Sequence, residues 1–353
     1  MEINAWPEEW NRYEALSLME KGEVLKASPH TLVAQQFIRT DLEGLCLLAT
    51  EIRRISKTRE GSRFLKGLLC DKRAVLYFAQ PSSRTYLSFL AACQTLGLDT
   101  MDVRDSKTSS EVKGESPEDT VRTFSSYVDM IIMRHPQGGF SERVAWMLSH
   151  SNREVPVINA GSGADQHPTQ ALLDIYTLER SFEKLDGIDG KTILFAGDLK
   201  RGRTVRSLAW LLTLYSEVQL VFAAPDALQI GADILVMLDE ANVSYRLCGR
   251  VQDALAEADA IYMTRLQDEW DQQGETSSMC TTDFRISAAD LPMMKKHAVV
   301  MHPLPRRQEI DSDLDNEPQA IYWRQMRNGM WIRAALILEA FNRSDAVWNW
   351  KES

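Results

Sequence analysis

A short polar segment, Pro81-Ser82-Ser83-Arg84-Thr85, combines the residue types that bind an anion. It follows an apolar run at 74–79, which predicts a strand, and it precedes a helical pattern that begins near Thr85. The first turn of a helix presents unpaired N–H groups and the positive end of the helix dipole, so the segment predicts a phosphate site. Taken alone, it is explained at least as well by a serine that caps the helix beside a solvated arginine.

Two further segments place polar side chains at the ends of expected strands. Arg134 ends an apolar run, where it either binds a ligand or simply stops the strand. His167 and Gln170 follow a strand expected at 155–160, and Pro168 suits the first position of a helix. Because His167 and Gln170 are three apart, they share one face of the first turn, where both can address one carbonyl oxygen. A purely structural histidine is the alternative.

The second half of the chain repeats this arrangement with arginines. The segment 197–204 approaches a phosphate-binding loop, but Arg203 stands where that loop requires lysine, so nucleotide binding is disfavoured. An arginine there offers a planar fork that matches a carboxylate. Arg265 and Gln267 end another expected strand and begin a polar loop at 266–281, whose length is typical of a lid as much as of a plain surface loop.

Two more segments complete the set. The segment 302–306 contains two prolines, which fix the backbone and leave the carbonyls of Leu304 and Pro305 free to accept hydrogen bonds. A rigid loop without further function is the alternative. Lys113 lies in a polar stretch, 109–115, expected to be a flexible loop.

These residues need strands and helices to position them. Short apolar runs alternate with amphipathic stretches, which indicates an α/β fold with mainly parallel sheets flanked by helices. Strands are expected at 74–79, 99–104, 128–134, 155–160, 192–197, 218–223, 259–263 and 297–301. Helices are expected at 30–57, 85–97, 117–127, 140–150, 168–184, 203–216, 227–242, 251–257 and 321–343.

A chain of 353 residues is long for one core, so two domains are expected. We place the first at 29–184 and the second at 185–320, where a glycine-rich turn begins the second sheet. The segment 321–353 is expected to return to the first domain as a helix. The segment 1–28 carries aromatic residues with little periodicity, so we expect a loosely ordered extension.

Composition narrows the classes of function. The chain is 44% apolar and 25% charged, and it has no apolar run long enough for a membrane span. The acidic amino terminus lacks the pattern of a secretory signal, so a cytoplasmic location is expected. A net charge of -10 disfavours nucleic acid as a partner. Five scattered cysteines favour reduced thiols, and the six histidines show no metal-ligand spacing, so we expect neither disulfides nor a metal.

Together the segments resemble the transcarbamoylase family over about residues 30–343, and within it the members that use aspartate. The family patterns S-T-R-T, K-G-E, M-R-H-P, H-P-T-Q, G-D-L-x-x-G-R-T, M-T-R-x-Q and H-P-L-P-R correspond to residues 82–85, 113–115, 133–136, 167–170, 197–204, 263–267 and 302–306. The resemblance implies a two-domain enzyme that joins carbamoyl phosphate, held by the first domain, to L-aspartate, held by the second. The products would be N-carbamoyl-L-aspartate and phosphate, in pyrimidine biosynthesis, without metal or cofactor.

The resemblance also implies residue roles. Catalysis would depend on Arg84, Thr85, Lys113, Arg134 and His167. The phosphate would be held by Ser82, Ser83, Arg84, Thr85 and Arg134, the carbonyl oxygen by Thr85, Arg134 and His167, and the carbamoyl NH₂ by Gln170 and the carbonyls of Leu304 and Pro305. Aspartate would be bound by Arg203, Arg265 and Gln267, while Lys113 closes over both ligands.

In this family Ser109 and Lys113 reach the site from a neighbouring subunit, so the resemblance implies a homotrimer with shared active sites, and regulatory chains are a possible partner. Relatives that use ornithine carry a cysteine where this chain has Pro303, which favours aspartate. A transcarbamoylase for another amino acid and a catalytically silent scaffold are the alternatives. Keeping several mutually repelling cations would cost a scaffold stability without benefit.

Three positions depart from the family pattern. Gln80 stands where the family usually has a glutamate that pairs arginines, so we predict that Gln80→Glu alters aspartate affinity. Tyr86 and Leu90 replace an arginine and a glutamate. Positions four apart on a helix are neighbours, so we expect an apolar contact in place of an ion pair.

Overall fold

The computed structural model describes residues 6–104, 114–163, 166–266 and 285–352, and it divides the chain into two compact units. The first comprises Met1–Leu173 and Gly329–Ser353, and the second comprises Asp174–Asn328. Both divisions fall inside helices, α8 (Pro168–Phe182) and α11 (Tyr322–Ala340), whereas we placed the domain limits at helix ends. The periodicity of a helix does not reveal where along its length the packing partners change.

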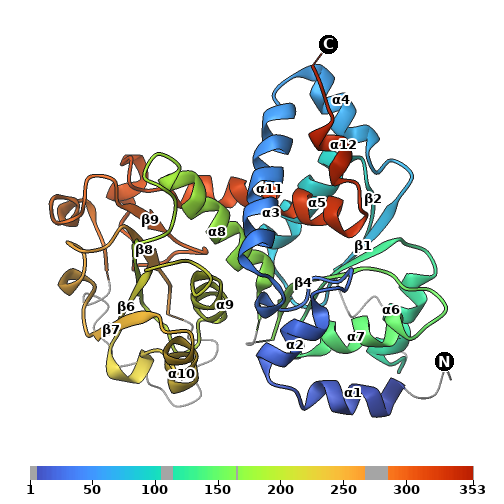
Figure 1. Ribbon diagram of the computed structural model, residues 1–353, viewed down its shortest axis with the longest axis horizontal. Helices are drawn as coiled ribbons and strands as arrows, with labels where there is room; N and C mark the ends of the chain where they lie inside the picture. Colours follow the sequence, from blue (N-terminus) through green and yellow to red (C-terminus); the bar gives the residue numbers. More distant parts are fainter. Residues whose placement is uncertain (1–5, 105–113, 164–165, 267–284, 353) are drawn as a thin grey trace. The chain divides into compact units, whose positions relative to one another are not determined.

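The first unit is built on a four-stranded parallel sheet in the order β2-β1-β3-β4 (Figure 1). Its strands are β1 (Arg73–Phe78), β2 (Asp99–Val103), β3 (Met130–His135) and β4 (Val157–Ser162). The residues of β3 and β4 are buried throughout, as expected for parallel strands covered on both faces. All four strands were predicted within two residues; continuous apolar runs mark β1, β3 and β4, whereas β2 is largely exposed and has no such run.

Helices surround this sheet. They are α3 (Arg39–Ile55), α4 (Arg59–Gly67), α5 (Ser83–Leu96), α6 (Pro117–Ser125), α7 (Phe140–Ser149), the first part of α8, the second part of α11, and α12 (Ser344–Trp348). The return of the carboxyl-terminal segment is confirmed, because Arg333 on α11 donates to Ser88 on α5 at 2.6 Å and covers the ring of Phe89. The helices α4 and α12 were not predicted.

The helix expected at 30–57 begins only at Arg39. Upstream of it, the backbone of Thr31 pairs with β4, and Gln36 accepts the Leu32 amide at 2.7 Å while donating to the His30 carbonyl. These contacts hold the segment extended and then in the short 3₁₀ turn η1 (Ala34–Gln36). A tertiary contact therefore overrides a pattern that looked helical.

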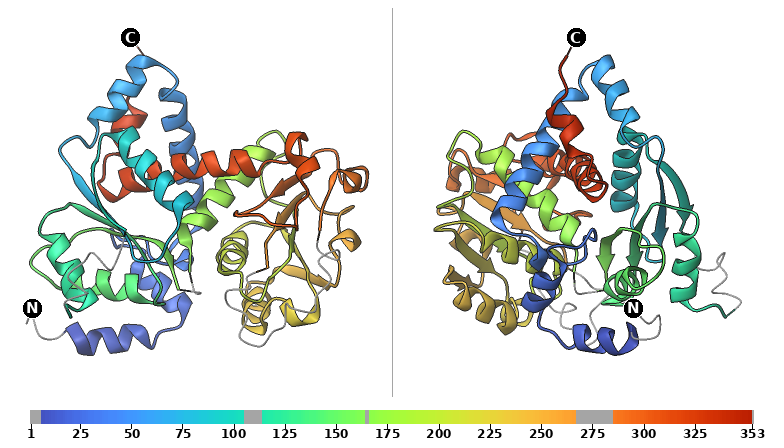
Figure 2. Two further views of the ribbon diagram at one scale, coloured as in Figure 1. Left: turned by 180° about the vertical axis from the view of Figure 1, so that it is seen from behind. Right: turned by 45° about the vertical axis from the view of Figure 1, so that its right-hand side comes forward.

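The expectation of a loosely ordered extension at 1–28 is wrong for residues 6–28, the part of this segment that the structure describes. The segment forms α1 (Trp6–Glu14) and α2 (Leu18–Leu25), and α1 runs along α7 (Figure 2). Trp10 and Tyr13 are buried in the same core cluster as β1, β3 and β4, and the Tyr13 ring contacts Trp146 with centroids 4.9 Å apart. Each helix is too short for its apolar positions to establish a period, which is why the sequence did not reveal them.

The second unit contains a five-stranded parallel sheet in the order β7-β6-β5-β8-β9. The strands are β5 (Thr192–Ala196), β6 (Gln219–Ala223), β7 (Ser244–Cys248), β8 (Ala260–Met263) and β9 (Val299–Met301), and the helices are the remainder of α8, α9 (Arg203–Leu212), α10 (Ala232–Glu240) and the start of α11. Strand β7 was missed because it lies at the edge, largely exposed, and lacks an apolar run. The helix expected at 251–257 is only a 3₁₀ turn, η5 (Val251–Asp253).

The parallel fold explains why the polar segments matter. Each one follows a strand of its own sheet, and the carboxyl ends of parallel strands meet at one edge. In the described residues no helix is both long and apolar enough to cross a membrane.

Candidate active site

The predicted phosphate-binding segment is the turn that joins β1 to α5. Ser82 occupies the N-cap position of α5, but its side chain makes no capping hydrogen bond and instead donates to Thr85 Oγ1 at 3.1 Å. The alternative of a simple serine cap is therefore not supported for Ser82. The main-chain N–H of Gln80 donates to the main-chain carbonyl of Arg134 at 3.2 Å, which connects this turn to the end of β3.

Arg134 and His167 come together against Gly161, at the end of β4. Gly161 has φ +120, and a Cβ at this position would overlap Nη1 of Arg134 and lie 3.3 Å from Cδ2 of His167. Only glycine allows this close approach. Arg134 also donates to the Ala160 carbonyl at 3.2 Å, and both side chains are at least nine-tenths buried. A buried guanidinium beside an imidazole forms a preorganised set of donors for an oxyanion.

Helix α8 begins at Pro168, as predicted, so His167 immediately precedes its first turn. The main-chain N–H of Gln170 donates to the His167 carbonyl at 3.0 Å, and Gln170 is buried, with 6% exposure. Thr169 between them is fully buried, and its hydroxyl has no hydrogen-bond partner among the described residues. Thr169 was not among the predicted site residues, although it lies inside the H-P-T-Q pattern.

In the second unit, the loops after β5 and β8 touch each other. Gly197 has φ +107, and a Cβ on it would collide with the Thr264 carbonyl oxygen. The Thr264 hydroxyl donates to the Ala196 carbonyl at 3.0 Å. This contact brings the segment that leads to Arg203, the first residue of α9, next to the segment that continues into Arg265.

The loop after β5 also contains an acid that the sequence analysis did not select. Asp198 is fully buried, and it accepts both the Arg201 amide and the Arg201 guanidinium at 3.2 Å. Because a buried carboxylate is costly unless it is paired, this interaction fixes the loop before Arg203. The signal in the sequence was an acidic residue directly after an apolar strand.

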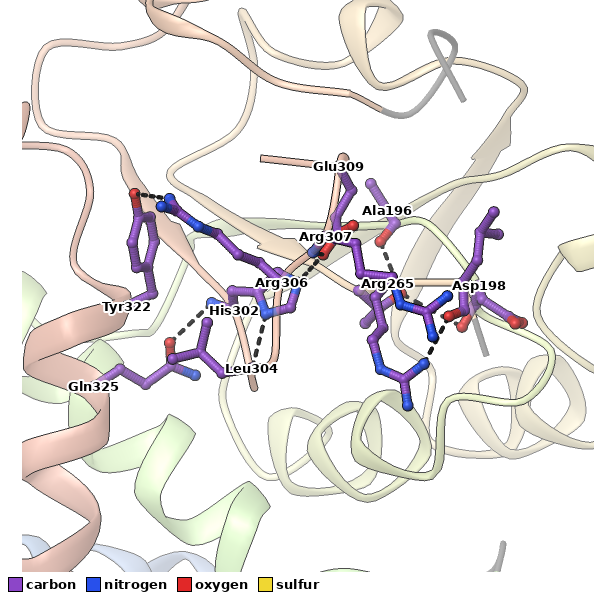
Figure 3. Close-up of polar contacts among 12 residues, drawn as sticks. Ala196, Asp198, Arg265, His302, Leu304, Arg306, Arg307, Glu309, Tyr322 and Gln325 are labelled. Atoms are coloured by element: carbon purple, nitrogen blue, oxygen red, sulfur yellow. Dashed lines mark hydrogen bonds and ion pairs between the residues drawn. The ribbon is translucent and has the colours of Figure 1, made fainter. Parts of the chain in front are cut away.

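The segment 302–306 follows β9 and is organised by His302 (Figure 3). Its Nδ1 accepts the Leu304 amide at 2.7 Å, so the proton of the neutral ring lies on Nε2, which is 2.7 Å from Glu309 Oε1. Burial would raise the pKa of Glu309, but the hydrogen bonds from His302 and from the main-chain N–H of Arg307 outweigh it and lower the pKa. Leu304 has φ +51, a left-handed conformation that is rare for a leucine.

Arg306, next in this segment, has a structural partner. Its guanidinium forms an ion pair with Asp315 and donates to the Tyr322 hydroxyl at 3.1 Å (Figure 3). This agrees with its omission from the predicted ligands.

The structure places the predicted residues that it describes in two sets, one in each unit, after strands of the unit's own sheet. In the first unit these are Ser82, Ser83, Arg84, Thr85, Arg134, His167 and Gln170, and in the second unit they are Arg203, Arg265, Leu304 and Pro305. Lys113, Gln267 and Ser109 lie outside the described residues. Within the described ranges no cluster of three or more histidine, cysteine or acidic side chains could hold a metal ion.

Tyr86 makes polar contacts that the sequence analysis did not foresee. Its hydroxyl donates to Asp102 at 2.6 Å, and the Arg104 guanidinium lies over its ring at 4.2 Å from the centroid. The prediction of an apolar contact with Leu90 missed this pairing. Tyr86 therefore connects α5 to the end of β2.

Comparison with known families covers both units. Residues 29–180 match the carbamoyl-P binding domain of aspartate/ornithine carbamoyltransferase, and residues 189–339 match the Asp/Orn binding domain. The chain is 41% identical over 308 residues to aspartate carbamoyltransferase 1, chloroplastic, of Pisum sativum, covering 86% of this chain and 76% of the relative. It is also 41% identical over 278 residues to the aspartate carbamoyltransferase catalytic subunit of Vibrio vulnificus, covering 78% of this chain and 87% of the relative.

Solved structures agree. Aspartate transcarbamoylase from Trypanosoma cruzi, in complex with N-(phosphonacetyl)-L-aspartic acid, superposes with a TM-score of 0.75 at 36% identity, over 87% of this chain and 94% of that one. The catalytic subunit of M. jannaschii aspartate transcarbamoylase superposes with a TM-score of 0.77 at 34% identity, over 89% of this chain and 98% of that one. With both domains matched and these relatives aligned over most of their length, the chain belongs to the aspartate/ornithine carbamoyltransferase family.

Proposed function

We propose that the chain is an aspartate carbamoyltransferase, which transfers the carbamoyl group of carbamoyl phosphate to the α-amine of L-aspartate. Relatives over most of the chain carry this name, and the Trypanosoma cruzi enzyme has been solved with carbamoyl aspartate and phosphate. The observation that carries the proposal is the convergence of Arg134 and His167 on Gly161, beside the turn at Ser82–Thr85. This arrangement suits a phosphate joined to a carbonyl.

The chemistry requires positioning and charge stabilisation. The neutral amine of aspartate attacks the carbonyl carbon, a C–N bond forms, and negative charge collects on the carbonyl oxygen. Arg134, His167 and Thr85 are suited to stabilise that charge, and one such donor contributes about 3–4 kcal/mol to lowering the barrier. The C–O bond to phosphate then breaks, and the departing phosphate accepts the proton that the amine loses.

The second unit supplies the cations for the acceptor. Arg203 and Arg265 lie on adjoining loops after β5 and β8, and each guanidinium can bind one carboxylate through two parallel hydrogen bonds. Aspartate has two carboxylates, whereas ornithine has one and carries an additional cation. The pair of arginines therefore favours aspartate.

A phosphate-release assay with carbamoyl phosphate and a panel of amino acids tests the proposal. We expect turnover with L-aspartate, none with ornithine, and a loss of at least about a thousandfold in kcat/KM for Arg84→Ala. Turnover with a different amino acid would identify another transcarbamoylase. Absence of turnover with every acceptor would support the silent scaffold.

We also propose that the protein is a homotrimer with shared active sites and that it acts in the cytoplasm, in pyrimidine biosynthesis. The support for the trimer is the correspondence of Lys113 to the family's K-G-E pattern. Arg84→Ala and Lys113→Ala subunits, each inactive alone, should regain part of the activity when they are dissociated and mixed, because one site of the hybrid would be intact. No recovery in a hybrid verified by mass would contradict shared sites.

A further inference from the structure

A buried chain of polar side chains connects β8, α8 and α11 to the loop at 302–306. The Tyr262 hydroxyl donates to Asp174 Oδ2 at 2.7 Å, and Gln325 Nε2 donates to Asp174 Oδ1 at 2.6 Å. Gln325 Oε1 in turn accepts the main-chain N–H of His302 at 2.9 Å (Figure 3). All four residues have 0% exposure, so water does not compete for these hydrogen bonds.

Gln325 holds a position that requires an amide. Its oxygen accepts from the backbone of His302 while its nitrogen donates to Asp174, and an ionised glutamate of the same size could only accept. Because the Asp174 carboxylate only accepts, it fixes which way the amide of Gln325 points. The hydrogen bond from Tyr262 holds that carboxylate from the opposite side.

The hydrogen bonds of Gln325 also restrain Leu304, because His302 connects the two residues. The backbone of His302 is held by Gln325, and its ring accepts the Leu304 amide. Leu304 has φ +51, and a branched residue in that conformation persists only where its surroundings enforce it. The direction of the carbonyls of Leu304 and Pro305 therefore depends on where His302 is fixed.

We infer that Gln325 is a positioning residue for recognition of the carbamoyl NH₂, acting through His302 on the carbonyls of Leu304 and Pro305. This inference rests on the proposed function and deepens it. Gln325 and Asp174 do not touch substrate in this scheme. Their effect is specific for an acyl phosphate that carries N–H donors, as opposed to one that carries a methyl group.

The chain offers a matched control one helical turn further on. Asn328 on α11 donates to Thr177 on α8 at 3.0 Å, and both side chains are buried. This pair joins the same two helices, and its hydrogen bond lies one helical turn away from the one that Gln325 makes with Asp174. Its loss should disturb the packing of the helices about as much as the loss of Gln325.

The experiment compares Gln325→Leu with Asn328→Leu in the full-length protein. We expect Gln325→Leu to raise KM for carbamoyl phosphate about tenfold, as for loss of a well-aligned hydrogen bond, while the inhibition constant of acetyl phosphate changes less than about twofold. Acetyl phosphate lacks the NH₂ group and so does not use those carbonyls. Asn328→Leu should leave both constants unchanged.

Tyr262→Phe provides a second variant if Gln325→Leu does not fold. It removes one hydroxyl at the far end of the chain of hydrogen bonds, and we expect the same selective effect, reduced to about threefold. The inference would be overturned if these variants weakened the binding of carbamoyl phosphate and of acetyl phosphate equally, or if they weakened neither.

Hydrogen exchange separates this inference from the proposed function, because it requires no turnover. The Leu304 amide should exchange at least about tenfold faster in Gln325→Leu than in Asn328→Leu. If the parent protein proves inactive but this difference appears, the proposed function fails, and what stands is that Gln325 fixes the backbone of Leu304 through His302. If the parent is active and the two variants are indistinguishable in exchange and in KM, the positioning role fails alone.

Discussion

Gly161 lies so close to Arg134 that a Cβ on the glycine would occupy the space of the arginine's Nη1. Gly161→Ala should therefore displace the guanidinium from the proposed carbamoyl site. We expect kcat/KM to fall about a hundredfold with the carbamoyl phosphate saturation curve shifted to higher concentration, since displacing a positioned catalytic group by about 1 Å has an effect of that size. Steady-state kinetics measure both quantities.

Gly139→Ala is the control for Gly161→Ala, because Gly139 also has a positive φ, +69, but nothing lies within 4 Å of a Cβ there. It also places an alanine at positive φ, with less strain because +69 lies in the left-handed helical region, and it leaves Arg134 in place. Similar kinetic losses in the two variants would show that strain, not displacement of Arg134, is responsible.

Gln80→Glu tests the departure from the family pattern. Gln80 Oε1 is buried and has no hydrogen-bond partner among the described residues. A carboxylate there restores the charge that the family usually has, so we expect the KM for aspartate to fall several-fold. An unchanged aspartate saturation curve would contradict the prediction, and Gln80→Ala should show no decrease in KM.

His30 makes the stability of the first unit depend on pH. Its Nδ1 accepts the Val157 amide at 2.9 Å and its Nε2 lies 2.8 Å from the Ser149 hydroxyl, so the buried ring is held neutral. Burial lowers the pKa of His30 from its ordinary value of 6.5 to about 4. Between these values the unfolded chain binds a proton that the folded chain does not, so stability falls as pH decreases from 6.5 towards 4, by roughly 3 kcal/mol.

Urea unfolding across this pH range measures the effect, with His30→Asn for comparison. The asparagine oxygen can accept the Val157 amide but does not titrate. The difference in unfolding free energy between the two proteins should therefore shrink as pH decreases below 6.5. A constant difference from pH 7 to pH 4 would show that His30 does not titrate on unfolding.

Tyr86→Phe removes the hydroxyl that binds Asp102 while keeping the ring beneath Arg104. Burial, followed by the Asp102 hydrogen bond, raises the pKa of Tyr86 to about 12, so the hydroxyl remains a donor through the neutral range. We expect a loss of about 1 kcal/mol in unfolding free energy, with little change in kcat. Denaturant midpoints measure the loss, and Leu87→Ala at the exposed next residue should show much less.

The sequence predicted the strands that position the site, because β1, β3, β4 and β5 are continuous apolar runs and each ends in a recognisable polar segment. Strand β7 and the helices α1 and α2 gave no comparable signal. Edge exposure removes the apolar run, and a helix of eight or nine residues shows too few turns for a period to emerge.

For the site, motifs in the sequence predicted the residues proposed to bind substrate. They did not predict the buried polar residues that hold those residues in place. Asp198, Asp174 and Gln325 are buried polar residues whose partners lie elsewhere in the sequence, and a pattern of single residues does not reveal a pairing across 151 positions such as that of Asp174 with Gln325. Only the fold specifies such pairs.

The helices at the amino terminus extend the core of the first unit beyond the domain that the family model matches. The family match begins at residue 29, yet Trp10, Tyr13 and Leu25 fill the core beneath β3 and β4. A chain trimmed to the shared domain would keep every proposed ligand and still expose an apolar face. The domain that the family model matches and the buried core of the first unit therefore begin at different residues of this chain.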